Sequence, residues 1–415
     1  MTANKPRILH LGKYDSTSSE AGGIESAIET LTEHLSDNFN QMVVVFTRES
    51  KKFKLIQSNA GIKKLLVPVH IVSGYAPVNF FLHFSLKRII HIFSPDIIHV
   101  HMPGIMPFFC FHELKKKTTI VHWHADVQGT RVSKHCIFPV YRLFEQGLLK
   151  NADAIITTSP QYLDSSKSLK YYKKKCSVIP LGIADITGPA DMTGTIANAA
   201  IHHASDIQGS ILSEPEVLPA KIDNFIKKKR LILSVGRLAY YKGYTFLVEA
   251  MKFIEDYNAV LLIAGEGNER QEIEQKIQNF NLKDKIMLPG KISHTEKKLL
   301  LSRAEIFCLP SIDRAEAFGV SLVEAMQFSL PLVTTDIKGS GVNYVNLHNR
   351  TGLSVNPGNS LELARSLNTL LNHTELAKKL GKNAKQRFID YFQVSAMAEK
   401  IKKHYFKLLN AKGDF

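Results

Sequence analysis

Cysteine is scarce in this chain of 415 residues, and its four cysteines are scattered at positions 110, 136, 176 and 308. They form no C-x-x-C pair, which argues against a zinc site and against a disulfide framework. Long apolar runs are also missing, since none reaches the roughly 18–20 residues that cross a bilayer. The first residues, MTANKPRILHLG, lack a signal-peptide core. Together these absences predict a cytoplasmic protein in a reducing compartment.

Acidic residues are sparse in the first half of the chain. Residues 1–183 hold 23 Lys plus Arg against 13 Asp plus Glu, and no acid occurs between residues 50 and 95. Such a surface attracts phosphate on nucleic acid, anionic lipid or a substrate, and charge alone does not choose among them. The basic runs lie among aliphatic residues rather than stacking aromatics, which argues against nucleic acid. An anionic membrane surface stays open as a partner, with VNFFLHFSLKRIIHIF either docking there or forming a core helix with a cationic edge.

Short runs of β-branched and aliphatic residues alternate with longer amphipathic segments along the chain. This is the pattern of βα units on parallel sheets. We expect strands at 7–12, 42–47, 96–102, 119–124, 154–159, 177–180, 230–236, 259–265, 284–290, 305–310, 330–335 and 351–355. The fold class is therefore α/β, with two doubly wound, Rossmann-like domains facing one another across a cleft.

The domain boundaries follow from a change of composition in the middle of the chain. Residues from 185 to 222 are rich in Gly, Ala, Ser, Thr and Pro without a clear period. We expect a first domain at 1–184, a linker or insertion at 185–226 and a second domain at 227–392. A C-terminal helix at about 393–415 is expected to return and pack on the first domain.

Candidate ligand-binding residues lie in the loops after strands of the second domain, where open α/β sheets bind ligands. Arg237 and Lys242 follow the strand RLILSV, and two cations at a helix start suit a diphosphate, although solvated charges are the plainer interpretation. Gly265 and Gly267 follow the next strand. Arg270 replaces the third glycine of a dinucleotide fingerprint, which disfavours a nicotinamide-dependent oxidoreductase.

The stretch EAFGVSLVEAM places Glu316 in a loop and Glu324 about one turn inside the following helix. Each carboxylate is suited to accept hydrogen bonds from sugar hydroxyls. The alternative is an ordinary acidic helix start with one solvated glutamate. Free amides at this helix start would hold a diphosphate between the two acids. These amides belong to Phe318, Gly319, Val320 and Ser321.

The segments VGRLAYYKG, LLIAGEGNER and SIDRAEAFGVSLVEAM resemble the retaining, group 1 glycosyltransferases of family 4, which have the GT-B architecture. The resemblance extends to AGGIESAIETL, WHAD, PLVTTD and GSGVNYVN and covers most of the chain. It implies that Glu316 holds the transferred sugar and that Glu324 binds the nucleoside ribose. Arg237 and Lys242 would neutralise the departing diphosphate.

The same resemblance assigns roles to further residues. His124 would reach across the cleft towards the sugar, although a lone histidine is more often structural, and Asp126 would orient its imidazole or contact the acceptor. Gly22 and Gly23 would help to hold the diphosphate. Independently of the resemblance, glycine at Gly265 lets a ligand approach the backbone closely, with a tight turn as the alternative. Lys291 and Ile292 would line the base pocket. No D-x-D triplet is present, so we expect no metal and no cofactor, with Arg and Lys stabilising the leaving group.

The resemblance implies a nucleotide-diphosphate sugar as donor and a glycan or polyprenyl-diphosphate-linked glycan as acceptor. The WHAD, YYKG and GSGVNYVN pattern is most similar to bacterial mannosyl and rhamnosyl transferases of surface-polysaccharide assembly, so GDP-mannose is the expected donor. A nucleotide-sugar epimerase on the same architecture is the alternative, with an oxidoreductase as a more distant one.

Overall fold

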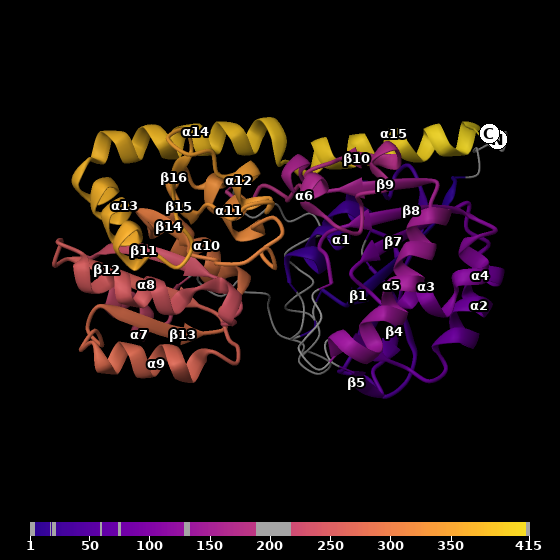
Figure 1. Cartoon of the computed structure of the whole chain (residues 1–415), viewed down its shortest axis with the longest axis horizontal. Helices are drawn as coiled ribbons and strands as arrows, with labels where there is room; N and C mark the ends of the chain where they lie inside the picture. The colour runs from indigo at the N-terminus through magenta and orange to yellow at the C-terminus, as the bar shows by residue number, and fades with distance from the viewer. Residues whose placement is uncertain are drawn as a thin grey trace, which may run out of the picture. The chain divides into compact units, whose positions relative to one another are not determined.

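The computed structural model describes residues 5–16, 18, 22–58, 60–73, 76–127, 133–187 and 217–411. Two compact units make up the chain, and α15 (Val394–Ala411) belongs to the first one although it follows the second in sequence (Figure 1). The first unit comprises residues 1–184 and 393–415, and the second comprises most of the residues between them. Residues 188–216, most of the expected linker, and residues 412–415 of the tail lie outside the described part.

The first unit is built on an eight-stranded sheet in the order β10-β9-β8-β7-β1-β2-β4-β3. All neighbours are parallel except β3 and β4, and β5 and β6 form a separate antiparallel pair. Its strands are β1 (Arg7–Tyr14), β2 (Asn40–Thr47), β3 (Lys54–Gln57), β4 (Lys63–Pro68), β5 (Ile71–Ser73), β6 (Ala76–Val78), β7 (Ile97–Met102), β8 (Thr118–Trp123), β9 (Ala154–Thr157) and β10 (Cys176–Val178).

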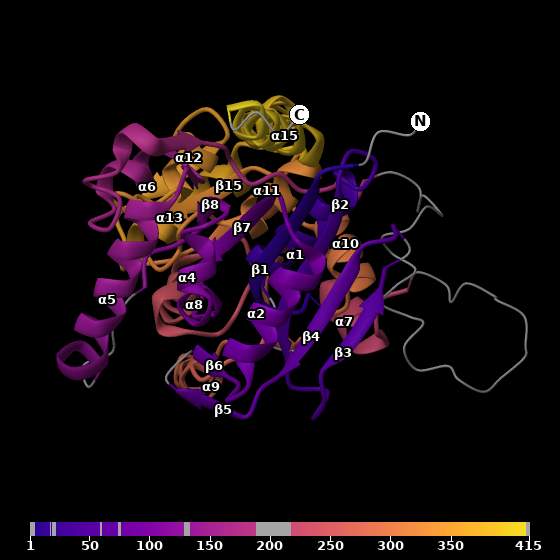
Figure 2. The same ribbon diagram turned by 90° about the vertical axis from the view of Figure 1, so that its right-hand side faces the viewer.

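Helices cover both faces of this sheet. They are α1 (Gly23–His34), α2 (Leu82–Phe93), α3 (Met106–Phe109), α4 (Phe111–Leu114), α5 (Ser133–Asn151), α6 (Pro160–Ser165), the 3₁₀ turn η1 (Lys173–Lys175) and α15. Figure 2 shows α1 against the sheet beside β2 and β4, with α15 along the same unit. The Tyr405 hydroxyl of α15 lies 2.5 Å from His99 Nδ1, and its ring packs edge-on against Phe39. The C-terminal helix is therefore part of the core of the first unit.

The second unit holds a six-stranded, wholly parallel sheet in the order β13-β12-β11-β14-β15-β16. Its strands are β11 (Arg230–Val235), β12 (Ala259–Ala264), β13 (Ile286–Gly290), β14 (Ile306–Leu309), β15 (Leu332–Thr335) and β16 (Gly352–Val355). Its helices are α7 (Ala220–Ile226), η4 (Tyr240–Lys242), α8 (Tyr244–Ala250), η5 (Met251–Phe253), α9 (Arg270–Asn279), α10 (His294–Arg303), α11 (Val320–Gln327), α12 (Val342–Val345), α13 (Ser360–Asn372) and α14 (Thr374–Tyr391).

All twelve expected strands are present, and the α/β fold class is confirmed. The sequence pattern missed β3 to β6, because the β3–β4 ribbon lies at a sheet edge where β3 is largely exposed and its apolar alternation is weak. It also missed α7, which lies inside the segment assigned to the linker. Among the described residues, each helix is too short or too polar to span a lipid bilayer.

Candidate active site

The centre of the second sheet is the point where the strand order reverses. β12 and β13 follow β11 on one side, whereas β15 and β16 follow β14 on the other, and β11 pairs directly with β14. Loops that leave the carboxyl ends of two such strands border the usual ligand crevice of an open α/β sheet. The loop after β11 carries Arg237 and Lys242, and the loop after β14 carries Glu316.

Lys242 and Glu316 form a buried ion pair at this point. Lys242 Nζ lies 2.5 Å from Glu316 Oε2, and each side chain is 10% exposed. Burial disfavours the lysine charge, but the Glu316 carboxylate together with Tyr241 and Tyr244 outweighs this effect, so the pKa of Lys242 is raised. Ser311 Oγ donates to the same oxygen at 3.0 Å. Among the described residues Glu316 Oε1 accepts no hydrogen bond, so it is free to accept one from a ligand hydroxyl.

The stretch GSGVNYVN, residues 339–346, supports the Glu316 loop through hydrogen bonds. Ser340 Oγ donates to the Glu316 carbonyl oxygen, and the Gly341 amide donates to the Ala317 carbonyl at 2.8 Å. Asn346 is buried and hydrogen-bonded to Thr334 and Leu353. This motif therefore holds the backbone of the loop that carries Glu316. Its residues are explained by this structural role, and no ligand contact is needed to explain them.

Helix α11 begins directly after the loop, and no side chain caps its N-terminus. Gly319, the N-cap, has a φ of +87° and offers no side-chain cap, and a Cβ there would press on Leu322. The first amides of α11, including those of Val320 and Ser321, are therefore available to an anion. Phe318 is 3% exposed and packs edge-on against Phe392, so it can contribute its backbone alone.

The second predicted acid, Glu324, pairs with a lysine that sequence reasoning missed. Lys297 Nζ on α10 lies 2.5 Å from Glu324 Oε1, with the two side chains 16% and 20% exposed. No local signal identifies Lys297, because the packing of α10 near α11 is a tertiary feature. Lys291 and Ile292 occupy the loop that leads into α10, exposed and partly buried respectively.

Gly265 lies in the β12–α9 loop with a φ of +148°. A Cβ at this position would overlap the carbonyl oxygen of Gly236, and a Cβ at Gly267 would overlap the backbone of Leu238. These glycines thus allow the loop after β12 to pack closely on the loop after β11. A contact between Gly265 and a ligand stays a prediction.

The glycine loop of the first unit is partly satisfied by its own helix. The Gly22 amide donates to Glu25 Oε2 at 2.9 Å, and Gly23 is the first residue of α1. A phosphate at this amide would have to displace the Glu25 carboxylate. Participation of Gly22 and Gly23 in anion binding therefore remains a prediction.

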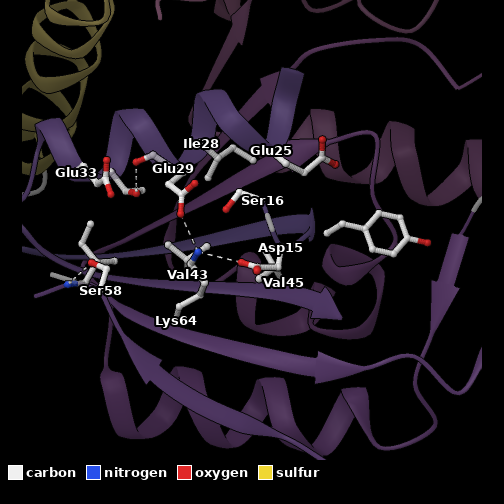
Figure 3. A pocket seen from close by; sticks show the side chains of 13 residues that line it. Asp15, Ser16, Glu25, Ile28, Glu29, Glu33, Val43, Val45, Ser58 and Lys64 are labelled. Atoms are coloured by element: carbon white, nitrogen blue, oxygen red, sulfur yellow. Dashed lines mark hydrogen bonds and ion pairs between the residues drawn. The ribbon is translucent and has the colours of Figure 1, made fainter. Parts of the chain in front are cut away.

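A pocket opens beside α1, and Figure 3 shows the Lys64 ammonium between Asp15 and Glu29 in it. The ammonium lies 2.9 Å from Asp15 and 3.0 Å from Glu29. Burial, together with the Glu29 carboxylate, raises the pKa of the adjacent Glu33 to about 7. Since carboxylates outnumber the lysine, this pocket suits hydroxyls or a cation better than a phosphate.

His124 directly follows β8 and is 2% exposed. Its Nε2 lies 3.1 Å from His101 Nδ1, while its Nδ1 has no hydrogen-bond partner among the described residues. Asp126 instead accepts hydrogen bonds from Trp123 Nε1 and Ser166 Oγ. His101 therefore orients the imidazole, and the predicted orienting role of Asp126 is wrong.

Two α/β sheets of eight and six mostly parallel strands are the architecture of GT-B glycosyltransferases. The family model Glycosyltransferase Family 4 matches residues 21–185, and the family model Glycosyl transferases group 1 matches residues 220–387. The chain belongs to glycosyltransferase family 4, a retaining family, and is a glycosyltransferase.

Two curated relatives are similar along most of their length. O-antigen chain mannosyltransferase C of Escherichia coli is 28% identical over 79% of this chain and 80% of its own. The D-rhamnosyltransferase WbpZ of Pseudomonas aeruginosa is 28% identical over 72% of this chain and 70% of its own. Among solved structures, sucrose-phosphate synthase from Thermosynechococcus elongatus has a TM-score of 0.76 and 21% identity, covering 98% of this chain and 100% of that one, which shows the shared fold.

Proposed function

We propose that this glycosyltransferase transfers mannose from GDP-mannose to a glycan or polyprenyl-diphosphate-linked acceptor in surface-polysaccharide assembly. The similarity to an O-antigen mannosyltransferase and to a D-rhamnosyltransferase supports the process and a mannosyl-type or rhamnosyl-type transferred sugar. The observation that carries the proposal is the buried Lys242–Glu316 pair beside the uncapped start of α11. This site combines a cation, helix-start amides and a carboxylate oxygen that can accept hydrogen bonds from hydroxyl groups.

The reaction breaks the bond between C1 of the sugar and the diphosphate oxygen. A bond forms between C1 and an acceptor hydroxyl oxygen on the same face, and the hydroxyl proton passes to a phosphate oxygen of the leaving group. The protein has to stabilise negative charge on the departing diphosphate. Lys242, Arg237 and the α11 amides are the groups that we assign to this task.

The two glutamates are assigned to the two ends of the donor. Glu316 Oε1 accepts hydroxyl hydrogen bonds of the sugar and stabilises the developing oxocarbenium ion. Glu324 binds the ribose hydroxyls from its position on α11, and Lys291 and Ile292 border the base. His124 contacts a hydroxyl of the transferred sugar. Because side chains and amides supply the positive charge, we expect turnover without a divalent ion.

The donor is identified by a panel experiment. Purified protein is mixed with GDP-mannose, GDP-rhamnose, UDP-glucose and UDP-N-acetylglucosamine, with and without chelator, and melting temperature and nucleotide diphosphate release are measured. We expect GDP-mannose to raise the melting temperature most, with no effect of the chelator. Conversion of one sugar nucleotide into another without transfer would instead identify an epimerase.

Replacement of Glu316 by Gln tests the site itself. We expect kcat to fall by about 100-fold or more, because the amide cannot stabilise the oxocarbenium charge. Glu305→Gln is the matched control, since Glu305 precedes β14 at its opposite end and pairs with Arg230 at the surface. Equal turnover in the two variants, both folded by circular dichroism, would remove Glu316 from the mechanism.

The acceptor side includes a candidate membrane surface on α2. Leu82, Leu86, Ile90 and Phe93 of this helix are buried. Its opposite face exposes Phe84 and Ile92, which are 72% and 69% exposed, and Lys87 and Arg88 are exposed as well. Apolar side chains flanked by cations suit an anionic lipid surface.

Vesicle flotation tests this surface. We expect binding to phosphatidylglycerol-containing vesicles but not to pure phosphatidylcholine, and loss of most binding in a Lys87→Glu, Arg88→Glu variant. Lys115→Glu, Lys116→Glu is the control, because it makes the same charge change at the end of α4. Binding that is unaffected by the α2 changes would refute this surface while leaving the transferase activity in place.

A further inference from the structure

Five histidines of the first unit lie on one face of its sheet. They are His10 on β1, His99 and His101 on β7, His122 on β8 and His124 directly after β8. His10 pairs in register with His99, and His101 with His122, so alternation along parallel strands brings all five to the same side. Each is at most 3% exposed. In the sequence the repeated H-x-H pattern was the available signal for this cluster.

All five imidazoles are neutral at physiological pH. Burial lowers the pKa of His10 to about 4 and that of His124 to about 3, and it lowers the pKa values of the other three well below the usual value. A neutral imidazole carries one N–H donor and one lone-pair acceptor. Which nitrogen holds the hydrogen is therefore decided by hydrogen-bond partners.

Gln41 fixes the direction of the first hydrogen bond. Its Nε2 lies 2.6 Å from the Thr32 carbonyl oxygen, and its Oε1 lies 3.1 Å from His10 Nε2. The opposite amide orientation would place two acceptor oxygens together, so Oε1 must face His10. Because an amide oxygen can only accept, His10 carries its hydrogen on Nε2 and a lone pair on Nδ1.

This assignment propagates along the chain of imidazoles. His10 Nδ1 lies 3.2 Å from His101 Nε2, so His101 donates from Nε2 and keeps a lone pair on Nδ1. His101 Nδ1 in turn lies 3.1 Å from His124 Nε2, so His124 donates from Nε2. The lone pair of His124 is left on Nδ1, which is buried without a partner among the described residues.

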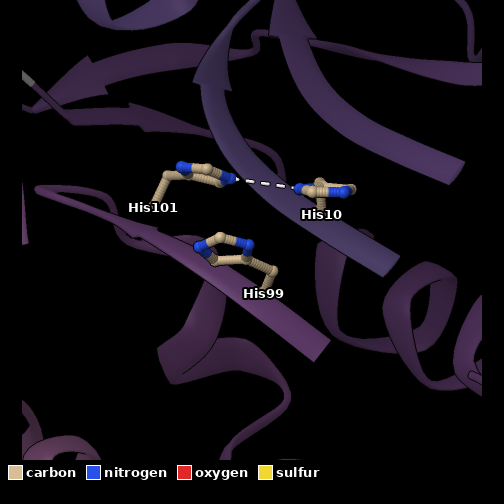
Figure 4. Close-up of side chains that lie close together, drawn as sticks. All are labelled: His10, His99 and His101. Carbon is tan, nitrogen blue, oxygen red and sulfur yellow. Dashed lines mark hydrogen bonds between the residues drawn. The ribbon is translucent and has the colours of Figure 1, made fainter. Parts of the chain in front are cut away.

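The ring orientations favour hydrogen bonding over a shared metal ion. The planes of His10 and His101 differ by 22°, and those of His99 and His101 by 18° with the ring centroids 4.4 Å apart. Figure 4 shows His10 and His101 facing each other edge to edge, with His99 beneath them. Lone pairs lie in the ring planes, so nearly parallel stacked rings cannot direct three of them at one point.

We propose that Gln41, His10 and His101 are positioning residues that set the tautomer of His124 and present its Nδ1 as an acceptor for a sugar hydroxyl. This inference deepens the proposed function and depends on it for the identity of the ligand. In this arrangement His124 recognises a neutral hydroxyl and does not transfer a proton during the reaction. The hydroxyl satisfies a buried acceptor that is otherwise unpaired.

The hydrogen bonds that lead from Gln41 through His10 and His101 to His124 are here called the relay. Nitrogen NMR of the full chain labelled with ¹⁵N-histidine tests the direction of the relay without any substrate. We expect His124, identified by the loss of its signals in His124→Asn, to be protonated on Nε2 and unprotonated on Nδ1. Protonation on Nδ1 in the unchanged protein would overturn the proposal. This measurement remains decisive even if substitutions at position 41 prevent folding.

Two substitutions at Gln41 then separate positioning from packing. Gln41→Met removes the acceptor, and we expect mixed tautomers at His124 and a rise in donor KM on the order of tenfold, the worth of about one hydrogen bond. Gln41→Glu, protonated in this buried place, restores the acceptor and the donor, so the tautomer and KM should return. His122→Phe keeps a ring packed on His124 and removes no hydrogen bond, because both ring nitrogens of His122 lack partners among the described residues, so it should leave the tautomer and KM unchanged.

The outcomes distinguish the relay from the proposed function. Loss of the Nε2–H tautomer in Gln41→Met with a raised KM supports both. The same tautomer change with an unaltered KM refutes the sugar-recognition role of the relay while the transferase activity stands. An unchanged tautomer in Gln41→Met refutes the relay itself.

Discussion

Acidification should unfold the first unit, because its five buried histidines are neutral when folded. Their folded pKa values lie below the unfolded value of 6.5. The unfolded chain therefore binds more protons below this pH, and the free energy of unfolding decreases as pH falls from about 6.5 towards 4. Above pH 6.5 the same groups have almost no effect.

The size of the effect follows from the pKa differences. At pH 5 protonation of each histidine stabilises the unfolded state by about 2 kcal/mol relative to the folded state. The five histidines together therefore lower the free energy of unfolding by roughly 10 kcal/mol. Glu33 acts in the opposite direction, since its folded pKa of about 7 favours the folded state on acidification. Its carboxyl group is partly exposed, so this gain is about 1 kcal/mol after allowance for solvent screening. A net loss of roughly 8–9 kcal/mol equals the whole stability of a typical domain.

The single tryptophan of the chain makes the assay selective. Trp123 is fully buried in β8 between His122 and His124 in sequence, so its fluorescence reports on the first unit alone. Denaturant titrations between pH 7 and pH 5 should give a free energy of unfolding that falls with the uptake of about four protons, five by the histidines less one from Glu33. Far-UV circular dichroism gives the matching signal for both units.

A matched substitution makes the prediction refutable. Both ring nitrogens of His122 lack hydrogen-bond partners among the described residues. His122→Leu should therefore remove one proton from the uptake and increase stability at pH 5 by about 2 kcal/mol relative to the unchanged protein. A free energy of unfolding that is constant from pH 7 to pH 5, or an unaltered slope in His122→Leu, would show that the cluster is not kept neutral by burial.

Two further changes test the second unit. Lys297→Met leaves the Glu324 carboxylate without its ion-pair partner but changes nothing at the reacting centre. KM for the donor should therefore rise by about tenfold with kcat nearly unchanged. Steady-state kinetics that show an equal fall in kcat would contradict this. Gly319→Ala should lower the free energy of unfolding by about 1–3 kcal/mol, because Gly319 has a φ of +87°. Gly22→Ala is the control and should lower it far less, because Gly22 has a φ of −140°. Equal melting temperatures of the two variants would be evidence against backbone strain at Gly319.

The sequence by itself determined the main strands and predicted candidate ligand-binding residues at their ends. Apolar runs such as those of β11 and β14 are local signals, and the loops that follow parallel strands border the usual ligand crevice of an open α/β sheet. Arg237, Lys242, Glu316 and Glu324 could therefore be proposed as candidate site residues from the sequence. Weak alternation at a sheet edge is the reason that β3 and β4 could not.

Only the tertiary structure decided which of these residues meet. Lys242 and Glu316 are 74 positions apart, and they pair because β11 lies beside β14 at the reversal of strand order. His10 and His101 are 91 positions apart and meet because β1 lies beside β7. Strand order depends on which long-range pairs bury the most surface together, and that balance is not encoded in any local pattern of residues.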